Sequence, residues 1–169
     1  MGCKYIMNES DLHNNRAYFA RPDFNVQKIT HYLRFQRAVG DYYSKKISAA
    51  AAFCGVTKPE ADVLLFLANN PLYDAARDIA KFRGFSKAYV SGAVEQLLEK
   101  KLISMSIDRE DRRRQHLKLC PEAEQTVETL RTAQCEFTEE LGEGITPAEL
   151  DIFFDVLEKF SENIAGRQG

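Results

Sequence analysis

Apolar residues recur along most of the chain with the spacing of helices. Between residues 25 and 52, large apolar side chains return every three or four positions, which predicts a long helix ending before Gly55. The same periodicity predicts further helices at 57–70, 75–83, 87–100, 121–141 and 146–165. Residues 1–22 show no clear period and are interpreted as a mobile N-terminal arm.

Start and stop residues stand at the ends of these predicted helices. Thr57, followed by Pro59 and Glu60, predicts the start of one helix. Thr146-Pro147-Ala148-Glu149 has the pattern of a capping box with proline at the first helical position. Asp74 and Ser86 are the expected N-caps of the two short helices, and Gly84 is expected to end the first of them.

One segment past the middle of the chain has the spacing of strands instead. Residues 102–107 and 115–119 read as two strands joined by a polar tip, which predicts a β-hairpin. The fold class is therefore mostly α with a small β-hairpin (α+β), in the order of a winged helix-turn-helix with its core at 57–119. We expect residues 23–169 to form a single domain, in which the helices at 25–52 and 121–165 flank that core.

Composition excludes several classes of protein. No apolar run approaches the length of about 18 residues that spans a membrane, and the first residues lack an apolar signal core, so we expect a cytoplasmic protein. The cysteines stand at 3, 54, 120 and 135 and the three histidines are scattered, which gives no spacing typical of a metal site or disulfide framework. No catalytic or nucleotide-binding motif is found, so we expect neither an enzyme nor a cofactor.

The charge of the chain is unevenly distributed. The formal net charge is −2, but residues 75–118 carry 11 Lys and Arg against 6 Asp and Glu, whereas residues 119–169 carry 3 against 12. A polyanion would therefore be attracted to the middle of the chain and repelled by its last third.

The helix predicted at 87–100 is the candidate recognition helix. In a helix-turn-helix, the start of the second helix enters the major groove of DNA. Here it would offer four side chains that reach phosphates or base edges, and Gly92 would let a backbone approach closely; the four are Ser86, Lys87, Tyr89 and Ser91. The alternative is an ordinary amphipathic helix of the core.

The hairpin tip carries the second candidate contact. Between positions 108 and 114 it holds four arginines, Arg109, Arg112, Arg113 and Arg114. Because like charges this close repel one another, we expect them to meet an anion, and the minor groove of DNA has the required negative potential. The alternative is a solvated loop whose arginines pair with its own acidic residues.

The order of elements and the tip sequence Asp108-x-x-Asp111-Arg112-Arg113 resemble the MarR (multiple antibiotic resistance regulator) family of bacterial transcription factors, over about 25–165. The resemblance implies a homodimer formed by the first and last helices, a recognition helix in the major groove, and wing arginines in the minor groove with Asp111 holding its neighbouring arginine. Three positions depart from the family pattern: Lys101 stands where a glycine is usual, Met105 where an arginine is frequent, and Leu119-Cys120-Pro121 where Leu-Thr is usual.

A homodimer is also predicted by the apolar stripe of the last helix, which includes Phe153, Leu157 and Phe160 and is more than a chain of this size readily covers. The function expected is that of a transcriptional regulator, a repressor, that binds double-stranded DNA at a pseudo-palindromic operator. The alternatives are a winged-helix module that binds another protein and a small helical enzyme, and the exposed arginines argue against the first.

Two features suggest a sensor. Tyr32, Tyr42 and Tyr43 on the first helix could line a pocket for a small aromatic or phenolic effector, although tyrosines at helical spacing are more often core or interface residues. Cys120, at the base of the wing, is a candidate redox site if His116 and Lys118 stabilise its thiolate. The alternative is a small buried residue at the start of a helix.

Overall fold

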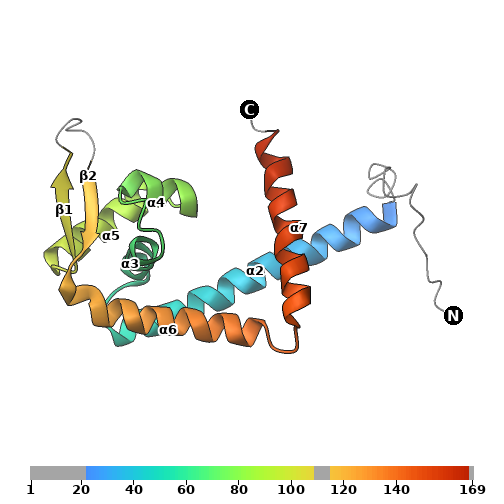
Figure 1. Cartoon of the computed structure of the whole chain (residues 1–169), viewed down its shortest axis with the longest axis horizontal. Helices are drawn as coiled ribbons and strands as arrows, with labels where there is room; N and C mark the ends of the chain where they lie inside the picture. Colours follow the sequence, from blue (N-terminus) through green and yellow to red (C-terminus); the bar gives the residue numbers. More distant parts are fainter. Residues whose placement is uncertain (1–21, 109–114, 168–169) are drawn as a thin grey trace. The chain divides into compact units, whose positions relative to one another are not determined.

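The computed structural model describes the backbone of residues 22–108 and 115–167 and the side chains of 28–108 and 115–167 (Figure 1). The predicted arm at 1–22 lies, except for Pro22, outside the described residues. The elements are α2 (Pro22–Phe53), α3 (Lys58–Asn69), α4 (Ala76–Arg83), α5 (Lys87–Glu99), β1 (Ile103–Ile107), β2 (Gln115–Leu119), the short 3₁₀ helix η2 (Pro121–Ala123), α6 (Glu124–Leu141) and α7 (Pro147–Ala165). The predicted fold class, mostly helical with one small hairpin, is confirmed.

The chain divides into two compact units, Met1–Lys45 and Lys46–Gly169. Of the first unit, the structure describes the part of α2 that begins at Pro22. The second unit contains the last turns of α2 and all the later elements. Among the described residues, no helix is both long and apolar enough to cross a membrane.

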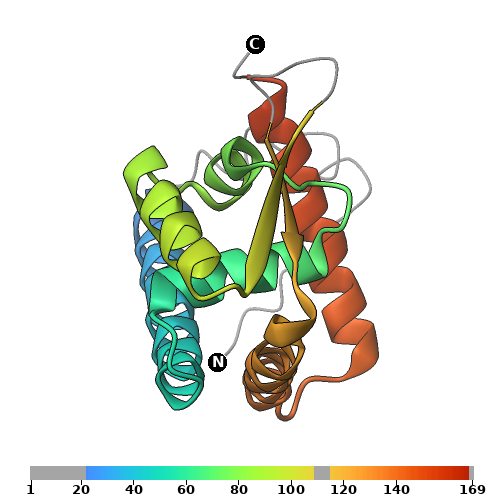
Figure 2. The same cartoon turned by 90° about the vertical axis from the view of Figure 1, so that its left-hand side faces the viewer.

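Helix α3 lies at the centre of the second unit. It contacts α5, β2 and α6, and these elements surround it in the view of Figure 2. Because α3 has neighbours on several sides, the whole run from Ala61 to Leu67 is buried, including Asp62. Ile79, Leu97 and Leu130 bring the buried sides of α4, α5 and α6 to the same core.

The helix ends confirm most of the predicted caps. Thr57 and Thr146 form capping boxes, and the Ser86 side chain accepts a hydrogen bond from the Tyr89 amide at 3.1 Å. Gly84 ends α4 in the left-handed region, with φ of 66°. The predicted cap at Asp74 is wrong: the N-cap of α4 is Ala75, which makes no side-chain cap bond. The Asp74 carboxylate faces the wing instead.

The hairpin is attached to the helix-turn-helix through its backbone. Strands β1 and β2 are antiparallel, with Ile103 opposite Leu119 and Ile107 opposite Gln115. The Leu117 amide donates to the Asp74 carbonyl at 2.7 Å, and the Cys120 amide donates to the Leu102 carbonyl at 3.0 Å. The first bond joins β2 to the residue two positions before α4, and the second closes the base of the hairpin between the residues that flank its strands.

Lys101 takes the backbone conformation that a glycine would adopt more easily. It is the one non-glycine residue with positive φ, 58°, among the described residues. The Lys101 amide donates to Leu98 and the Leu102 amide to Leu97, the paired bonds of a Schellman ending. The departure from the family pattern therefore leaves the turn intact, at the energetic cost of a side chain in the left-handed region.

Helix α7 presents an apolar surface that the chain leaves uncovered. None of its residues from Pro147 to Ala165 is buried. Its large apolar side chains are between 40% and 64% exposed, apart from the half-buried Leu150 and Leu157; the exposed ones are Ile152, Phe153, Phe154, Val156, Phe160 and Ile164.

Candidate nucleic-acid interface

A tight turn through Gly84 joins α4 to α5 and leaves the start of α5 exposed. The Phe85 amide donates to the Ala80 carbonyl at 3.1 Å, which closes the turn after α4. Three of the predicted contact residues, Ser86, Lys87 and Ser91, are exposed, as is Gly92. The first turn of a helix carries free amide groups and a partial positive charge, so this exposed end attracts an anion such as phosphate.

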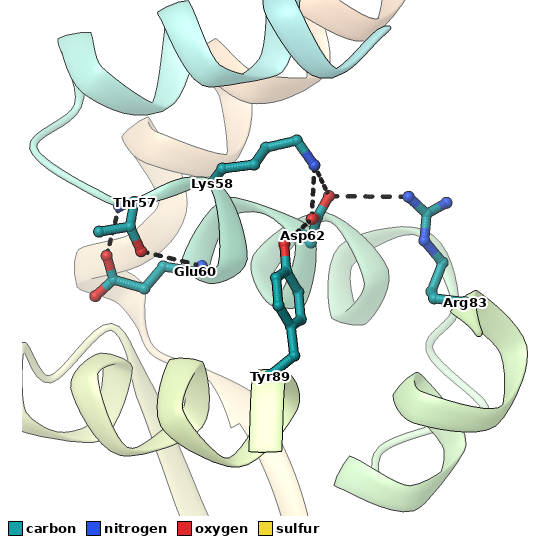
Figure 3. A network of polar contacts seen from close by, with 6 residues as sticks. All are labelled: Thr57, Lys58, Glu60, Asp62, Arg83 and Tyr89. Atoms are coloured by element: carbon teal, nitrogen blue, oxygen red, sulfur yellow. Dashed lines mark hydrogen bonds and ion pairs between the residues drawn. The ribbon is translucent and has the colours of Figure 1, made fainter. Parts of the chain in front are cut away.

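Tyr89 differs from the expectation for a residue on the solvent side. It is half-buried, and its hydroxyl donates to Asp62 Oδ2 at 2.8 Å (Figure 3). The interpretation of Tyr89 as a side chain offered to DNA is therefore corrected, because the ring turns back towards α3 and its hydroxyl binds Asp62. Burial, and then the hydrogen bond to Asp62, raise the pKa of Tyr89, so the hydroxyl keeps its proton and remains a donor.

Asp62 connects three helices through one buried carboxylate, whose side chain is 1% exposed. Lys58 Nζ lies 2.6 Å from each of its oxygens, and the Arg83 guanidinium at the end of α4 lies 3.8 Å from Oδ1 (Figure 3). With Tyr89 from α5, the carboxylate is surrounded by donors from α3, α4 and α5. A buried charge is tolerated when it is paired and hydrogen-bonded in this way.

Glu60 holds the other end of α5. The fully buried carboxylate accepts from the Thr57 amide at 2.5 Å. Lys100, at the end of α5, places its Nζ 2.8 Å from Oε1 and 3.0 Å from Oε2. Burial alone would raise the pKa of Glu60, but the bonds from Lys100 and Thr57 outweigh it and hold that pKa below its ordinary value. Helix α3 thus fixes both ends of α5.

Aromatic contacts strengthen the turn between α4 and α5. The Phe85 and Tyr89 rings lie 4.7 Å apart, and the Arg83 guanidinium lies 5.4 Å from the centroid of the Phe85 ring. Arg83 therefore interacts with both Phe85 and Asp62, which ties the end of α4 to the turn and to α3.

His116 on β2 lies between two carboxylates. Its Nδ1 is 2.8 and 2.9 Å from the two oxygens of Asp74, and its Nε2 is 3.0 Å from Oδ2 of Asp108. Asp74 precedes α4 and Asp108 follows β1, so the ring links the hairpin to the helix-turn-helix. The predicted tip contacts, Arg109, Arg112, Arg113 and Arg114, and the predicted support Asp111 lie outside the described residues.

The remaining candidate residues are found in other parts of the chain. Tyr32 and Tyr42 are exposed on α2 and Tyr43 is half-buried; the Tyr32 hydroxyl accepts from Gln36 at 2.8 Å. Phe153 and Phe160 are exposed on α7 and Leu157 is half-buried. Among the described residues, no group of three His, Cys, Asp or Glu side chains is arranged to hold a metal ion.

Cys120 is half-buried at the start of η2. The expectation that His116 stabilises its thiolate is corrected by the structure, because both ring nitrogens of His116 face carboxylates. Lys118, the other expected partner, is exposed on β2.

Sequence reasoning missed the two acidic residues of α3 as supports of α5. The sequence indicates Glu60 as part of a helix start but not as a partner of Lys100. A signal for Asp62 was present, since it is the single charge in the apolar run from Ala61 to Ala68. Such a residue, placed where burial is expected, must find partners.

Comparison with known proteins gives the same fold. The sequence model of the MarR family matches residues 55–114. No curated protein is similar enough in sequence to match the chain. A MarR-family transcriptional regulator from Silicibacter pomeroyi is similar in structure, with a TM-score of 0.71 and 19% identity over 84% of this chain and 94% of that one.

Two further structures with a similar fold come from work on DNA binding. The complex of MepR from S. aureus with DNA has a TM-score of 0.66 and 22% identity, over 78% of this chain and 97% of that chain. BpsR from Bordetella bronchiseptica, whose DNA binding is regulated by 6-hydroxynicotinic acid, has a TM-score of 0.62 and 24% identity, over 80% and 99%. The resemblance to the MarR family is confirmed in residues 55–114 and in the fold.

Proposed function

We propose that this chain binds double-stranded DNA in a sequence-specific manner and regulates transcription. The proposal starts from its winged helix-turn-helix, which resembles that of the MarR family. The observation that carries the proposal is the exposed start of α5, with Ser86, Lys87 and Ser91 on its surface. Both ends of α5 are held, because Tyr89 near its start and Lys100 at its end bind two buried carboxylates of α3. A rigid helix can place several side chains against base edges at once.

The start of α5 fits the major groove of DNA by its charge and shape. The helix N-terminus and Lys87 favour phosphate oxygens, and the hydroxyls of Ser86 and Ser91 can donate to or accept from base edges. Gly92 has no neighbour within 4 Å of the place a Cβ would occupy, so the backbone there is open to a close partner. The wing arginines Arg109, Arg112, Arg113 and Arg114 are proposed to reach the minor groove, supported by Asp111.

The DNA-binding form is proposed to be a homodimer. The uncovered apolar face of α7, with Phe153, Leu157 and Phe160, would be buried between two copies. A two-fold axis places two α5 helices about one DNA turn apart, roughly 34 Å, which predicts a pseudo-palindromic operator. Bound at such a site in the cytoplasm, the dimer would act as a repressor.

Release from DNA is proposed to follow binding of a small aromatic or phenolic effector. Support comes from BpsR, whose DNA binding is regulated by 6-hydroxynicotinic acid, an aromatic acid. The candidate residues for such a ligand are Tyr32, Tyr42 and Tyr43 on α2.

Selection of bound duplexes from a random pool tests the proposal. We expect recovery of a pseudo-palindrome whose affinity falls steeply between about 50 and 200 mM salt, because phosphate contacts release counterions. Lys87→Ala should weaken binding and reduce the slope of log affinity against log salt by about one per copy. Lys45→Ala, an exposed lysine of α2, is the matched control and should change neither.

Failure to enrich any sequence would contradict the proposal. A chain that binds no duplex even at low salt would instead favour the alternative, a winged-helix module that binds a protein. Equal effects of Lys87→Ala and Lys45→Ala would show that α5 does not make the proposed phosphate contact.

A further inference from the structure

The imidazole of His116 lies between carboxylates that come from two different parts of the fold. Asp74 stands immediately before the helix-turn-helix, and Asp108 stands where β1 leaves for the wing tip. The distances from the ring nitrogens are 2.8 Å to Asp74 and 3.0 Å to Asp108. All three side chains are shielded but not fully buried, with exposures between 23% and 32%.

The protonation state of His116 decides whether both contacts can exist. A neutral imidazole has one N–H, so one of its two nitrogens would present a lone pair to a carboxylate. The imidazolium has two N–H groups and can donate to Asp74 and Asp108 together. Two facing carboxylates also favour the charged ring by attraction. Hydrogen bonds from the ring to both carboxylates therefore require the imidazolium form.

The elements that pack against β2 carry further charged groups, among them the exposed Lys81 on α4. On α4, Arg77 lies 3.8 Å from Asp78, and on α3, Lys58 pairs with Asp62. Opposite His116 on β1 is the uncharged Ser106. Lys118, two positions further along β2, is exposed to solvent. Within the described residues, the ion-pair contacts recorded for the His116 ring are those to the carboxylates of Asp74 and Asp108.

These contacts lie where they can control the position of the wing. His116 is the second residue of β2 and so belongs to the half of the hairpin nearest the tip. The Leu117 amide already donates to the Asp74 carbonyl at 2.7 Å. The ring adds a side-chain bond to that same residue and a second one to Asp108. Loss of the contact between His116 and Asp74 would leave the bond from the Leu117 amide as the one hydrogen bond recorded, among the described residues, between β2 and Asp74.

We propose that His116 is a positioning residue, which in its protonated form holds the wing against the helix-turn-helix, so that DNA affinity falls as the pH rises. The inference rests on the proposed DNA-binding function. The pKa of a free histidine is about 6.5, and groups that favour the charged form move proton loss to higher pH. The stabilisation is complete below that value and is lost as the pH rises through the transition of the folded protein.

The protonation claim is tested without DNA by a proton NMR titration of the full chain. We expect Asp74→Asn and Asp108→Asn each to lower the pH midpoint of the His116 ring, because each removes a carboxylate that favours the charged form. A His116 midpoint that neither substitution lowers would overturn the proposal.

The positioning claim is tested by DNA affinity from pH 6 to 8.5, with the duplex recovered by selection and a random-sequence duplex. We expect the wild-type affinity for the selected duplex to fall by about fivefold or more, a typical coupling between sites. His116→Gln should remove this pH dependence, and the control His31→Gln should keep it. A pH dependence that survives in His116→Gln would overturn the proposal.

Asp108→Asn separates positioning from simple charge attraction. Removing a negative charge near DNA would strengthen binding by electrostatics alone, whereas loss of the contact to His116 should weaken it. Stronger binding by Asp108→Asn at pH 6 would therefore contradict the positioning role. If the wild-type chain binds neither duplex at any pH, the proposed function fails, while the NMR titration still decides the protonation of His116.

Discussion

Replacing Tyr89 with phenylalanine removes one hydrogen bond from the buried carboxylate of Asp62 and leaves the ring in place. The hydroxyl lies 2.8 Å from Oδ2, and the Asp62 side chain is 1% exposed, so water cannot readily substitute for the lost donor. A hydrogen bond to a charged group contributes about 1.5–3 kcal/mol. Because Lys58 remains 2.6 Å from both oxygens, we expect the lower part of that range.

The assay is urea denaturation at fixed protein concentration and neutral pH, since the stability of a dimer depends on concentration. Tyr89→Phe should lower the free energy of unfolding by about 1.5 kcal/mol. The matched control is Tyr73→Phe: the ring of Tyr73 packs 4.4 Å from that of Phe82, and no hydrogen bond of its hydroxyl is recorded among the described residues. The free energy of unfolding of Tyr73→Phe should stay within about 0.5 kcal/mol of the wild-type value.

A double-mutant cycle assigns the effect of Tyr89→Phe to its partner. In the Asp62→Asn background, Tyr89→Phe should lower the free energy of unfolding by clearly less than it does in the wild-type background, because the charged acceptor has been removed. The same variant should reduce the preference for the selected duplex over a random one, since the start of α5 is less firmly held. Equal losses for Tyr89→Phe and Tyr73→Phe, or a cycle without coupling, would refute the reasoning.

The other predictions concern the backbone of α5, the turn after α5, and the proposed dimer contact of α7. Gly92→Ala should raise the free energy of unfolding by about 0.5–1 kcal/mol, as expected inside a helix, yet weaken binding to the selected duplex if the backbone approaches DNA there; tighter binding would exclude that approach. Lys101→Gly should stabilise the chain in urea by about 1 kcal/mol, because the positive φ is strained for lysine; a loss of stability would show that its side chain makes a stronger contribution. Phe153→Glu should give monomers in sedimentation that bind the operator poorly, and intact dimers would remove α7 from the interface.

The sequence predicted the elements well because their signals are local. The helix start at Thr57, the capping box at Thr146, the cap at Ser86 and the stop at Gly84 each depend on residues close together in the chain. Periodicity then identified the buried sides of the helices. The order of helices and hairpin was sufficient to predict the winged helix-turn-helix.

The polar contacts that fix the candidate site could not be predicted in the same way. Asp74 is an acceptable N-cap by its sequence position, but its carboxylate binds a ring 42 positions later. Tyr89 occupies a surface position on its helix, but its hydroxyl reaches a buried acid 27 positions earlier. Such pairs depend on how α3, α5 and the hairpin pack, and a single sequence carries no signal for that packing.

The central claim is that two copies of α5 read neighbouring major grooves of one duplex. Dimethyl sulfate protection of guanine N7 on the selected duplex measures this most directly, because N7 lies in the major groove. We predict two protected patches centred about 10 base pairs apart, both lost with Lys87→Ala or in monomeric Phe153→Glu. Binding without N7 protection, or a single patch that survives both substitutions, would contradict the account.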